Sequence, residues 1–326
     1  KEMRQNVFDH YDCVTIGEVG GEASLEQGLL YASFDSKELD MVFNFDHNWC
    51  NNLWQINRLE DLKTDVVCLK KAFKKWQDTF KTKGWLPLNW LNHDQPRLLS
   101  HYGSIKHPLH SAKMLATLLY LKRGTPFIYQ GEEIGMTNYP FKDIDEFKDV
   151  STLNKYHEIK KNDPDIDHEK LMFMLSKSTR DHPRTPMQWN QEVHAGFSTQ
   201  TPWMPVHPNY KRVNVANALE DEESLFYHYQ KLFQLRKEGK YKELVLYGDY
   251  EIVDLFDKNL YTYKRCLNDL TLYVICSFSE DVITYDLSSF TIQDVLIHHA
   301  CEIKDDSNEV KMNPFGAIAL VLDGKI

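Results

Sequence analysis

The sequence predicts an α/β fold followed by an all-β module, and two patterns support this prediction. In the first 135 residues, short apolar runs alternate with helical patterns, which is typical of βαβ units and a parallel sheet. From Tyr241 onward, alternating apolar and polar segments are separated by turn residues, which is typical of a Greek-key sandwich. We therefore expect one domain at residues 1–240 and a second at residues 241–326.

Four short apolar runs in the N-terminal part each end in polar or ionisable side chains. They lie within residues 13–19, 38–47, 84–94 and 125–135, and the later ones are separated by segments with helical spacing. Ligands bind at the carboxyl ends of parallel strands, so we expect a functional site where these runs end. The side chains placed there are Glu18, Asp46, His47, His93, Asp94, Glu132 and Glu133.

Composition excludes several classes of protein. The net charge of −10 disfavours binding to nucleic acid or to an anionic membrane. No apolar stretch approaches the roughly 20 residues that span a bilayer, and the charged start "KEMRQNVFDHYD" is not a secretory signal. The six cysteines are scattered, without a CxxC pair or nearby histidines at ligand spacing. We therefore expect a cytoplasmic protein with reduced, mostly buried thiols and no zinc site.

Carboxyl groups at the ends of different parallel strands suit acid–base chemistry on an uncharged sugar. In glycoside hydrolysis one carboxyl group protonates the leaving oxygen, while a second attacks the sugar or activates water. Structural roles would explain the same residues: a salt bridge for Glu18, a helix cap for Asp94 and a satisfied loop histidine for His47. The residues alone therefore indicate a barrel-like α/β hydrolase or isomerase.

Five segments, taken together and in order, carry a more specific signal. "TIGEV", "NHDQPR", "GTPFIYQGEEIGMTN", "RDHPRTPMQW" and "HAGF" resemble glycoside hydrolase family 13, the α-amylase family. Within that family they are similar to the branch of oligo-1,6-glucosidases, dextran glucosidases and trehalose-6-phosphate hydrolases. The resemblance implies strands five to eight of a (β/α)₈ TIM barrel, a C-terminal β-sandwich, and cleavage of α-glucosidic bonds with retention.

The resemblance also implies roles for individual residues. Glu18 would be the general acid/base, and Asp94 the third carboxylate, which binds ring hydroxyls and stabilises the transition state. His93 would donate a hydrogen bond to the same sugar. The arginine of that subsite is matched best by Arg180, with Arg184 as the alternative.

The barrel rim on the leaving-group side would hold Asp46 and His47. Two departures from the family pattern affect the pocket. Ser151 stands in "DVST" where a glutamate is common, and Leu91 stands where Asn or Cys is usual. We expect the first change to alter contacts with the leaving group and the second to reshape the pocket floor.

The family's nucleophile is an aspartate at the end of the fourth strand, and nothing of that kind precedes Glu18. The expectation is therefore a truncated chain that has no glucosidase activity alone. A divalent cation, if the family site is used, would bind the missing half. Two strand edges would lie open, near "CVTIGE" and "PFIYQGEE", so we expect dimerisation, rearrangement or poor solubility unless they are covered.

The substrate within the branch is indicated by charge. A phosphotrehalase needs a basic cluster for its phosphate, whereas "FNFDHNWCNNLWQINR" carries Asp46 and, as its one Lys or Arg, Arg58. This favours neutral α-1,6-linked gluco-oligosaccharides over trehalose 6-phosphate. The remaining alternative is a non-catalytic relative used for binding or assembly, although such proteins usually lose the carboxylates that are present here.

Overall fold

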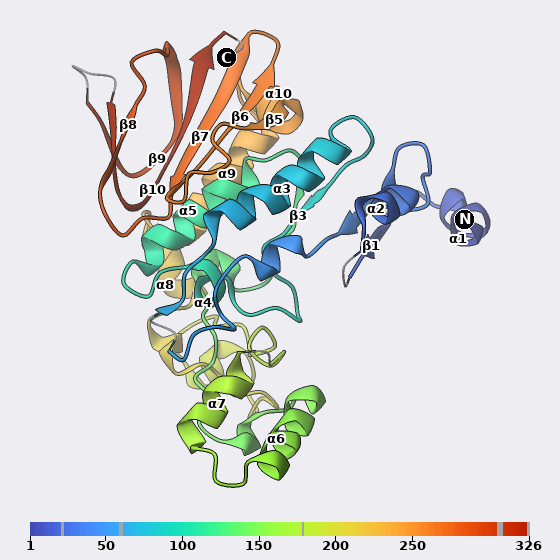
Figure 1. Cartoon of the computed structure of the whole chain (residues 1–326), viewed down its shortest axis with the longest axis vertical. Coiled ribbons are helices and arrows are strands. Elements are labelled where there is room, and N and C mark those ends of the chain that lie inside the picture. The colour runs from blue at the N-terminus through green and yellow to red at the C-terminus, as the bar shows by residue number, and fades with distance from the viewer. Residues whose placement is uncertain (21–22, 59–60, 178, 305–308, 325–326) are drawn as a thin grey trace.

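The computed structural model describes residues 1–20, 23–58, 61–177, 179–304 and 309–324. Figure 1 shows a β-sheet at one end of the molecule and a lobe formed by α6 (Val150–Asn162) and α7 (His168–Ser176) at the other. The helices α3 (Val66–Phe80), α5 (Pro108–Tyr120) and α9 (Leu225–Lys237) lie between them. None of the described helices is long and apolar enough to cross a membrane.

Each of the four predicted apolar runs contains a short strand. These are β1 (Ile16–Glu18), β2 (Met41–Phe43), β3 (Pro87–Leu88) and β4 (Thr125–Pro126). β1 pairs with β2, and β3 pairs with β4, both in parallel. The parallel α/β half of the prediction is therefore confirmed. Among the described residues, each of these four strands pairs with one neighbour, so the strands form two separate two-stranded ladders.

The helices form where capping residues and apolar spacing favour them. In α2 (Leu25–Ala32), Ser24 and Gln27 form a capping box, and the Asp65 carboxylate accepts a hydrogen bond from the first turn of α3. Ser224 occupies the N-cap position of α9, but its hydroxyl donates to the carbonyl of Ala218 and does not cap the helix. The remaining helices are α1 (Glu2–Asn6), α4 (Leu98–Tyr102), α8 (Val215–Glu220) and α10 (Lys242–Tyr247).

Residues 137–223, which the sequence predicts to be long and irregular, are partly helical. They contain α6, α7 and α8, and the Asp167 side chain caps α7 by accepting from the amide of Lys170. Leu171 and Leu175 of α7 are fully buried against a small apolar cluster that includes Phe141. The prediction missed these helices because their apolar faces are narrow and are covered by residues of the same lobe.

The C-terminal part begins with α10, which the prediction missed, and continues as the predicted β-structure, whose strands form a six-stranded antiparallel sheet in the order β5-β6-β7-β10-β8, with β9 also on β10. One face packs on α5, α9 and α10, while the outer face of β7 packs against β8 and the first part of β10. The strands are β5 (Asp249–Ile252), β6 (Leu260–Leu267), β7 (Leu270–Ser277), β8 (Ile283–Asp286), β9 (Ile292–Lys304) and β10 (Glu309–Asp323).

One hydrophobic core joins the helices to this sheet. Lys122 is buried in it, donates to the carbonyl of Leu118, and faces the rings of Tyr261 and Tyr263 at 4.4 and 4.5 Å. The buried Arg265 guanidinium donates to the Leu121 carbonyl and to three carbonyls of the α10 region. The predicted boundary after residue 240 stays a prediction, since the two parts share these contacts.

The cysteine prediction is wrong for one pair. Cys50 and Cys68 form a disulfide, with their Cα atoms 5.2 Å apart. The chain after β2 returns to the first turn of α3, and this brings together two cysteines 18 residues apart. Cys13 is free and exposed, and Cys266, Cys276 and Cys301 are free and buried.

Candidate active site

A cavity of about 540 Å³ lies at the carboxyl ends of β1, β2 and β3. Three of the predicted carboxylates line it: Glu18 after β1, Asp46 after β2, and Asp94 in the loop after β3. The structure thus brings together side chains that lie up to 76 positions apart, at the sheet edge where the sequence places them. The rest of the lining is mixed: Val19, Gly20, Ala23, Phe45, Asn48, Trp49, Trp76, Asn92 and Gln95.

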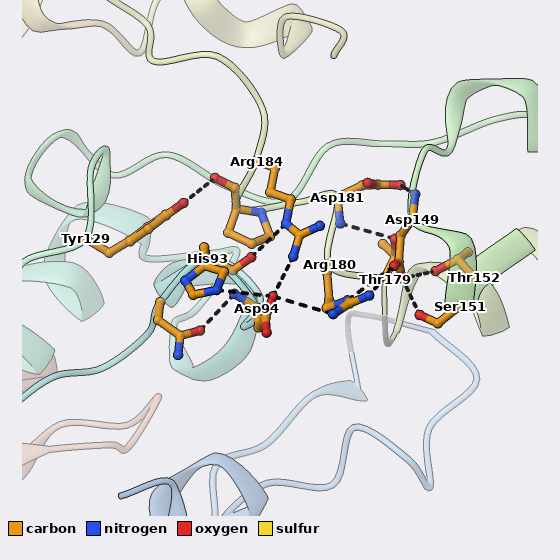
Figure 2. Close-up of polar contacts among 12 residues, drawn as sticks. His93, Asp94, Tyr129, Asp149, Ser151, Thr152, Thr179, Arg180, Asp181 and Arg184 are labelled. Carbon is orange, nitrogen blue, oxygen red and sulfur yellow. Dashed lines mark hydrogen bonds and ion pairs between the residues drawn. The ribbon is translucent and has the colours of Figure 1, made fainter. Parts of the chain in front are cut away.

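Asp94 lies between two arginines and a histidine (Figure 2). Arg184 donates a hydrogen bond from Nη2 to Asp94 Oδ1 at 2.6 Å, and its Nε donates to the His93 carbonyl. Arg180 Nη1 lies 4.0 Å from the same oxygen, and His93 Nε2 lies 3.7 Å from it. Both predicted arginines therefore reach Asp94, but Arg184, which the sequence ranked second, makes the direct hydrogen bond.

Arg180 is held in place by Asp149, a residue that the sequence did not identify as part of the site. Asp149 Oδ1 accepts from Nε and Nη2 of Arg180 at 3.2 and 2.9 Å, while Oδ2 accepts from the hydroxyls of Ser151 and Thr152. Burial alone would raise the pKa of Asp149, but these hydrogen bonds and the charge of Arg180 hold that pKa well below its ordinary value. Asp149 is therefore a fixed anion that orients Arg180.

Ser151 thus has a defined contact in this chain. Its hydroxyl donates to Asp149 at 2.6 Å. Asp181 completes this corner, because its carboxylate accepts from the backbone amides of Lys148 and Asp149 at 2.7 and 3.0 Å. The loop that begins α6 and the loop that carries the arginines are therefore joined by side-chain-to-backbone bonds.

Arg97, in the same "NHDQPR" segment as Asp94, connects the two loops beside the cavity. Its guanidinium is 1% exposed and donates to the carbonyls of Gln130, His182, Pro183 and Thr185. Burial lowers the pKa of Arg97 to about 10, so it remains charged at neutral pH. It fixes the segment that carries Arg184 relative to the loop that carries Asp94. Local sequence patterns could not predict this contact, since the acceptors lie 33 to 88 residues away along the chain.

Glu18 is exposed at the end of β1, and no described residue donates a hydrogen bond to it. A Cβ at Gly17, the residue before it, would lie 2.5 Å from Leu39 Cδ1, so a side chain at that position would require Leu39 to move. A proton donor in glycoside hydrolysis needs burial or a neighbouring carboxylate to adjust its acidity. The described residues leave this side of the cavity open.

Asp46 and His47 differ in their surroundings. Asp46 Oδ2 accepts from Lys75 Nζ at 2.8 Å and from the Trp76 indole at 2.9 Å while lining the cavity. His47 points the other way: it is buried, hydrogen-bonded to the Trp90 carbonyl at 3.1 Å and stacked on Phe73. Burial lowers the pKa of His47 to about 4, so it is neutral at pH 7. The placement of His47 at the rim is therefore wrong, and it anchors the segment instead.

Glu132 and Glu133 do not reach this cavity. Glu132 is buried under α5 and α9 and accepts from the hydroxyls of Tyr120 and Tyr229 at 2.5 and 2.6 Å. Burial raises the pKa of Glu132 to about 7, against the effect of both hydrogen bonds. The short 3₁₀ helix Glu132–Ile134 turns these side chains away from the strand end. Across the described ranges, no group of three or more His, Cys, Asp or Glu side chains is arranged to hold a metal ion.

Comparison with known proteins identifies the family. The alpha-amylase catalytic-domain family matches residues 1–245. The chain belongs to this family. It is 46% identical over 283 residues to the oligo-1,6-glucosidase of Halalkalibacterium halodurans, covering 85% of this chain and 48% of that protein. It is 41% identical over 283 residues to the trehalose-6-phosphate hydrolase of Bacillus subtilis, covering 85% and 48%.

Solved structures agree with this assignment over nearly the whole chain. A trehalose-6-phosphate hydrolase from Bacillus licheniformis matches with a TM-score of 0.88 and 39% identity, covering 99% of this chain and 58% of that chain. An isomaltulose synthase from Klebsiella matches with a TM-score of 0.87 and 30% identity, covering 98% and 57%. The chain therefore spans about half the length of the family members that it matches.

Proposed function

We propose that this chain forms part of a retaining α-glucosidase that acts on α-1,6-linked gluco-oligosaccharides. The observation that carries the proposal is the single cavity that Glu18, Asp46 and Asp94 line, with Arg184 hydrogen-bonded to Asp94. Similarity to oligo-1,6-glucosidases over 85% or more of the chain supports the same chemistry. His93, Arg180 and Arg184 would bind the sugar whose bond is cleaved, together with Asp94.

The proposed roles are those that the resemblance to the family implies, and the positions of the side chains support them. Glu18 would protonate the leaving oxygen and then activate water in the second step. Asp94, oriented by Arg184, would present a carboxylate to the sugar as positive charge develops on it, and a preorganised charge of this kind lowers the barrier. Asp46, fixed by Lys75 and Trp76, would lie on the leaving-group side.

The retaining mechanism needs two carboxyl groups about 5–5.5 Å apart, one acting as acid/base and the other as nucleophile. Glu18 would be the first. Asp94 is engaged by Arg184 and is assigned to charge stabilisation, so we infer that the nucleophile is not part of these 326 residues. This chain alone would then not hydrolyse glucosides.

The experiment uses two completed chains. In the first, the part of the Bacillus cereus oligo-1,6-glucosidase that does not align with this chain is fused to the N-terminus of this chain. In the second, the corresponding part of the Bacillus subtilis trehalose-6-phosphate hydrolase is fused in the same way. We expect both to hydrolyse isomaltose faster than trehalose 6-phosphate, and Glu18→Gln to abolish turnover in both. If neither completed chain is active, the enzymatic proposal fails and the non-catalytic binding role replaces it.

Trehalose 6-phosphate is the second candidate substrate, and the structural matches favour it. Two structures of a Bacillus licheniformis trehalose-6-phosphate hydrolase align with 99% of this chain, at TM-scores of 0.89 and 0.88. The residues that line the cavity oppose it, because they include three carboxylates and no Lys or Arg. A preference of both completed chains for trehalose 6-phosphate would make this the substrate.

Dimerisation through the open barrel edges is also proposed. The edge at β1 exposes Val14 and Ile16, and beside β4 a groove of about 860 Å³ is lined by apolar residues such as Ile128, Phe226 and Phe233. Exposed strand edges and apolar grooves favour association. Sedimentation velocity should give a concentration-dependent dimer for the chain and a monomer for the completed chains. A monomeric chain at all concentrations would contradict this proposal.

A further inference from the structure

Trp49 is exposed beside the cavity carboxylates. It ends the short 3₁₀ helix η2 (Asp46–Trp49), lines the same cavity as Glu18 and Asp94, and is 70% exposed. Trp76, the other tryptophan of the cavity, is buried and donates its indole N–H to Asp46. Exposing an indole forgoes the stabilisation that its burial would give, so the position of Trp49 needs an explanation.

The residues on both sides of Trp49 are held by hydrogen bonds and by a disulfide. Asp46 accepts hydrogen bonds from two side chains of α3, and His47 is bonded to the Trp90 carbonyl. The Tyr102 hydroxyl donates to the His47 carbonyl at 2.9 Å, and Cys50 is covalently bonded to Cys68 of α3. The indole is therefore presented by a segment that is anchored on both sides, and a ligand that contacts it would pay little ordering entropy.

The cavity beside the indole carries both apolar and polar side chains. Val19, Ala23 and Phe45 supply apolar surface, while Asn92, Gln95 and the three carboxylates supply hydrogen-bonding groups. A pyranose ring has the complementary character, because its C–H groups form an apolar face and its hydroxyls form a polar rim.

We propose that Trp49 is the stacking platform for the second sugar of the substrate, the one that leaves when the α-glucosidic bond is cleaved. The C–H face of that sugar packs on the indole, and its hydroxyls exchange hydrogen bonds with the amide side chain of Gln95. The inference rests on the proposed function, which defines the position of the cleaved bond. It adds Trp49 as a residue that selects substrates whose leaving group is a sugar.

The first test measures binding to the chain itself. Saturation-transfer NMR with isomaltose is recorded for the wild-type chain, Trp49→Ala, Trp49→Phe and the matched control Trp203→Ala. Trp203 is 68% exposed and lies outside the lining of this cavity. We expect isomaltose to bind at least 10-fold more weakly to Trp49→Ala, partial recovery in Trp49→Phe, and less than a 2-fold change in Trp203→Ala. Equal binding by Trp49→Ala and the wild type would overturn the inference.

The second test separates stacking from a structural role in the completed chains. Isomaltose has a sugar as its leaving group, whereas α-glucosyl fluoride has only a fluoride ion. We expect Trp49→Ala to raise KM for isomaltose about 10-fold and to leave both constants for α-glucosyl fluoride within 2-fold. Equal losses on both substrates would show a structural role and overturn the inference. If the completed chains are inactive while binding still depends on Trp49, the stacking role stands and the proposed reaction fails.

Discussion

The side of the cavity that carries Asp94 is held by many hydrogen bonds within the described part of this chain, whereas the side that carries Glu18 is not. Asp94 is held by Arg184, and the loops around it are joined by Arg97 and Asp149 through hydrogen bonds to side chains and backbone. Glu18 lies exposed at the end of β1, which pairs only with β2 among the described residues, and those residues offer its carboxylate no hydrogen bond. Only one of the two sides is therefore preorganised by the residues present.

This difference indicates where catalysis could be completed. Preorganised charge is effective because no reorganisation is needed during the reaction, and Asp94 meets that condition already. In the proposed reaction, Glu18 would also need a partner carboxylate and cover from water, which the described residues do not supply. If this comparison is right, substitutions on the Asp94 side should affect folding, and substitutions at Glu18 should affect only turnover in a completed chain.

The largest effect is expected for Arg97→Met. The change leaves several buried carbonyls without a donor, and each buried acceptor left unsatisfied costs about 1–3 kcal/mol. Urea unfolding followed by circular dichroism should show a decrease of this size in the free energy of unfolding. Arg58→Met is the matched control, since Arg58 is mostly exposed and pairs with Asp61 on the surface, and it should change stability by less than about 0.5 kcal/mol. A similar result for both variants would break the comparison.

The next effect concerns the disulfide that anchors the Trp49 segment. A bond that closes a loop between cysteines 18 residues apart stabilises by about 3 kcal/mol in the chain-entropy account. Cys68→Ser should lower the free energy of unfolding by about this amount, and Cys266→Ser by less. Alkylation of freshly lysed cells, followed by mass spectrometry, determines whether the bond exists in the cell. Fully alkylated Cys50 and Cys68 would show that it does not contribute there.

The pH dependence of stability tests the Asp94 side further. Glu132 lies in the segment after β4, which Arg97 contacts at the Gln130 carbonyl. Its folded pKa of about 7 lies above the ordinary value of 4.5, so the folded chain holds a proton that the unfolded chain has lost. Stability is therefore present in full below pH 4.5 and falls as pH rises to about 7, by about 3 kcal/mol for this group. Glu132→Gln should remove that fall, measured as the difference from wild type in urea titrations at pH 5 and 8. An unchanged slope would show that Glu132 does not titrate in this range.

The smallest changes in stability are expected for substitutions of the two carboxylates themselves, Asp94 and Glu18. Asp94→Asn keeps an acceptor for Arg184 but loses the charge, so we expect a loss of about 1 kcal/mol at this partly exposed site. Glu18→Gln should change the free energy of unfolding by less than about 0.5 kcal/mol. A larger loss at Glu18 than at Asp94 would reverse the comparison.

The sequence predicts the strand ends well because period, apolar runs and polar termini are local signals. Glu18, Asp46 and Asp94 could be assigned to one edge for that reason. The contacts that hold the site are non-local, and they were missed: Arg97 binds carbonyls distant in sequence, and Asp149 acts through Arg180. The direction of His47, the Cys50–Cys68 bond and the helices of the α6–α7 lobe likewise depend on which segments pack together.

The most direct test of the account is hydrolysis of 4-nitrophenyl α-glucoside by the chain alone and by the two completed chains, at equal concentration. We predict no turnover above the uncatalysed rate for the chain alone, and Glu18-dependent turnover in at least one completed chain. Turnover by the chain alone that Glu18→Gln abolishes would contradict the account, because a nucleophile would then lie within these 326 residues.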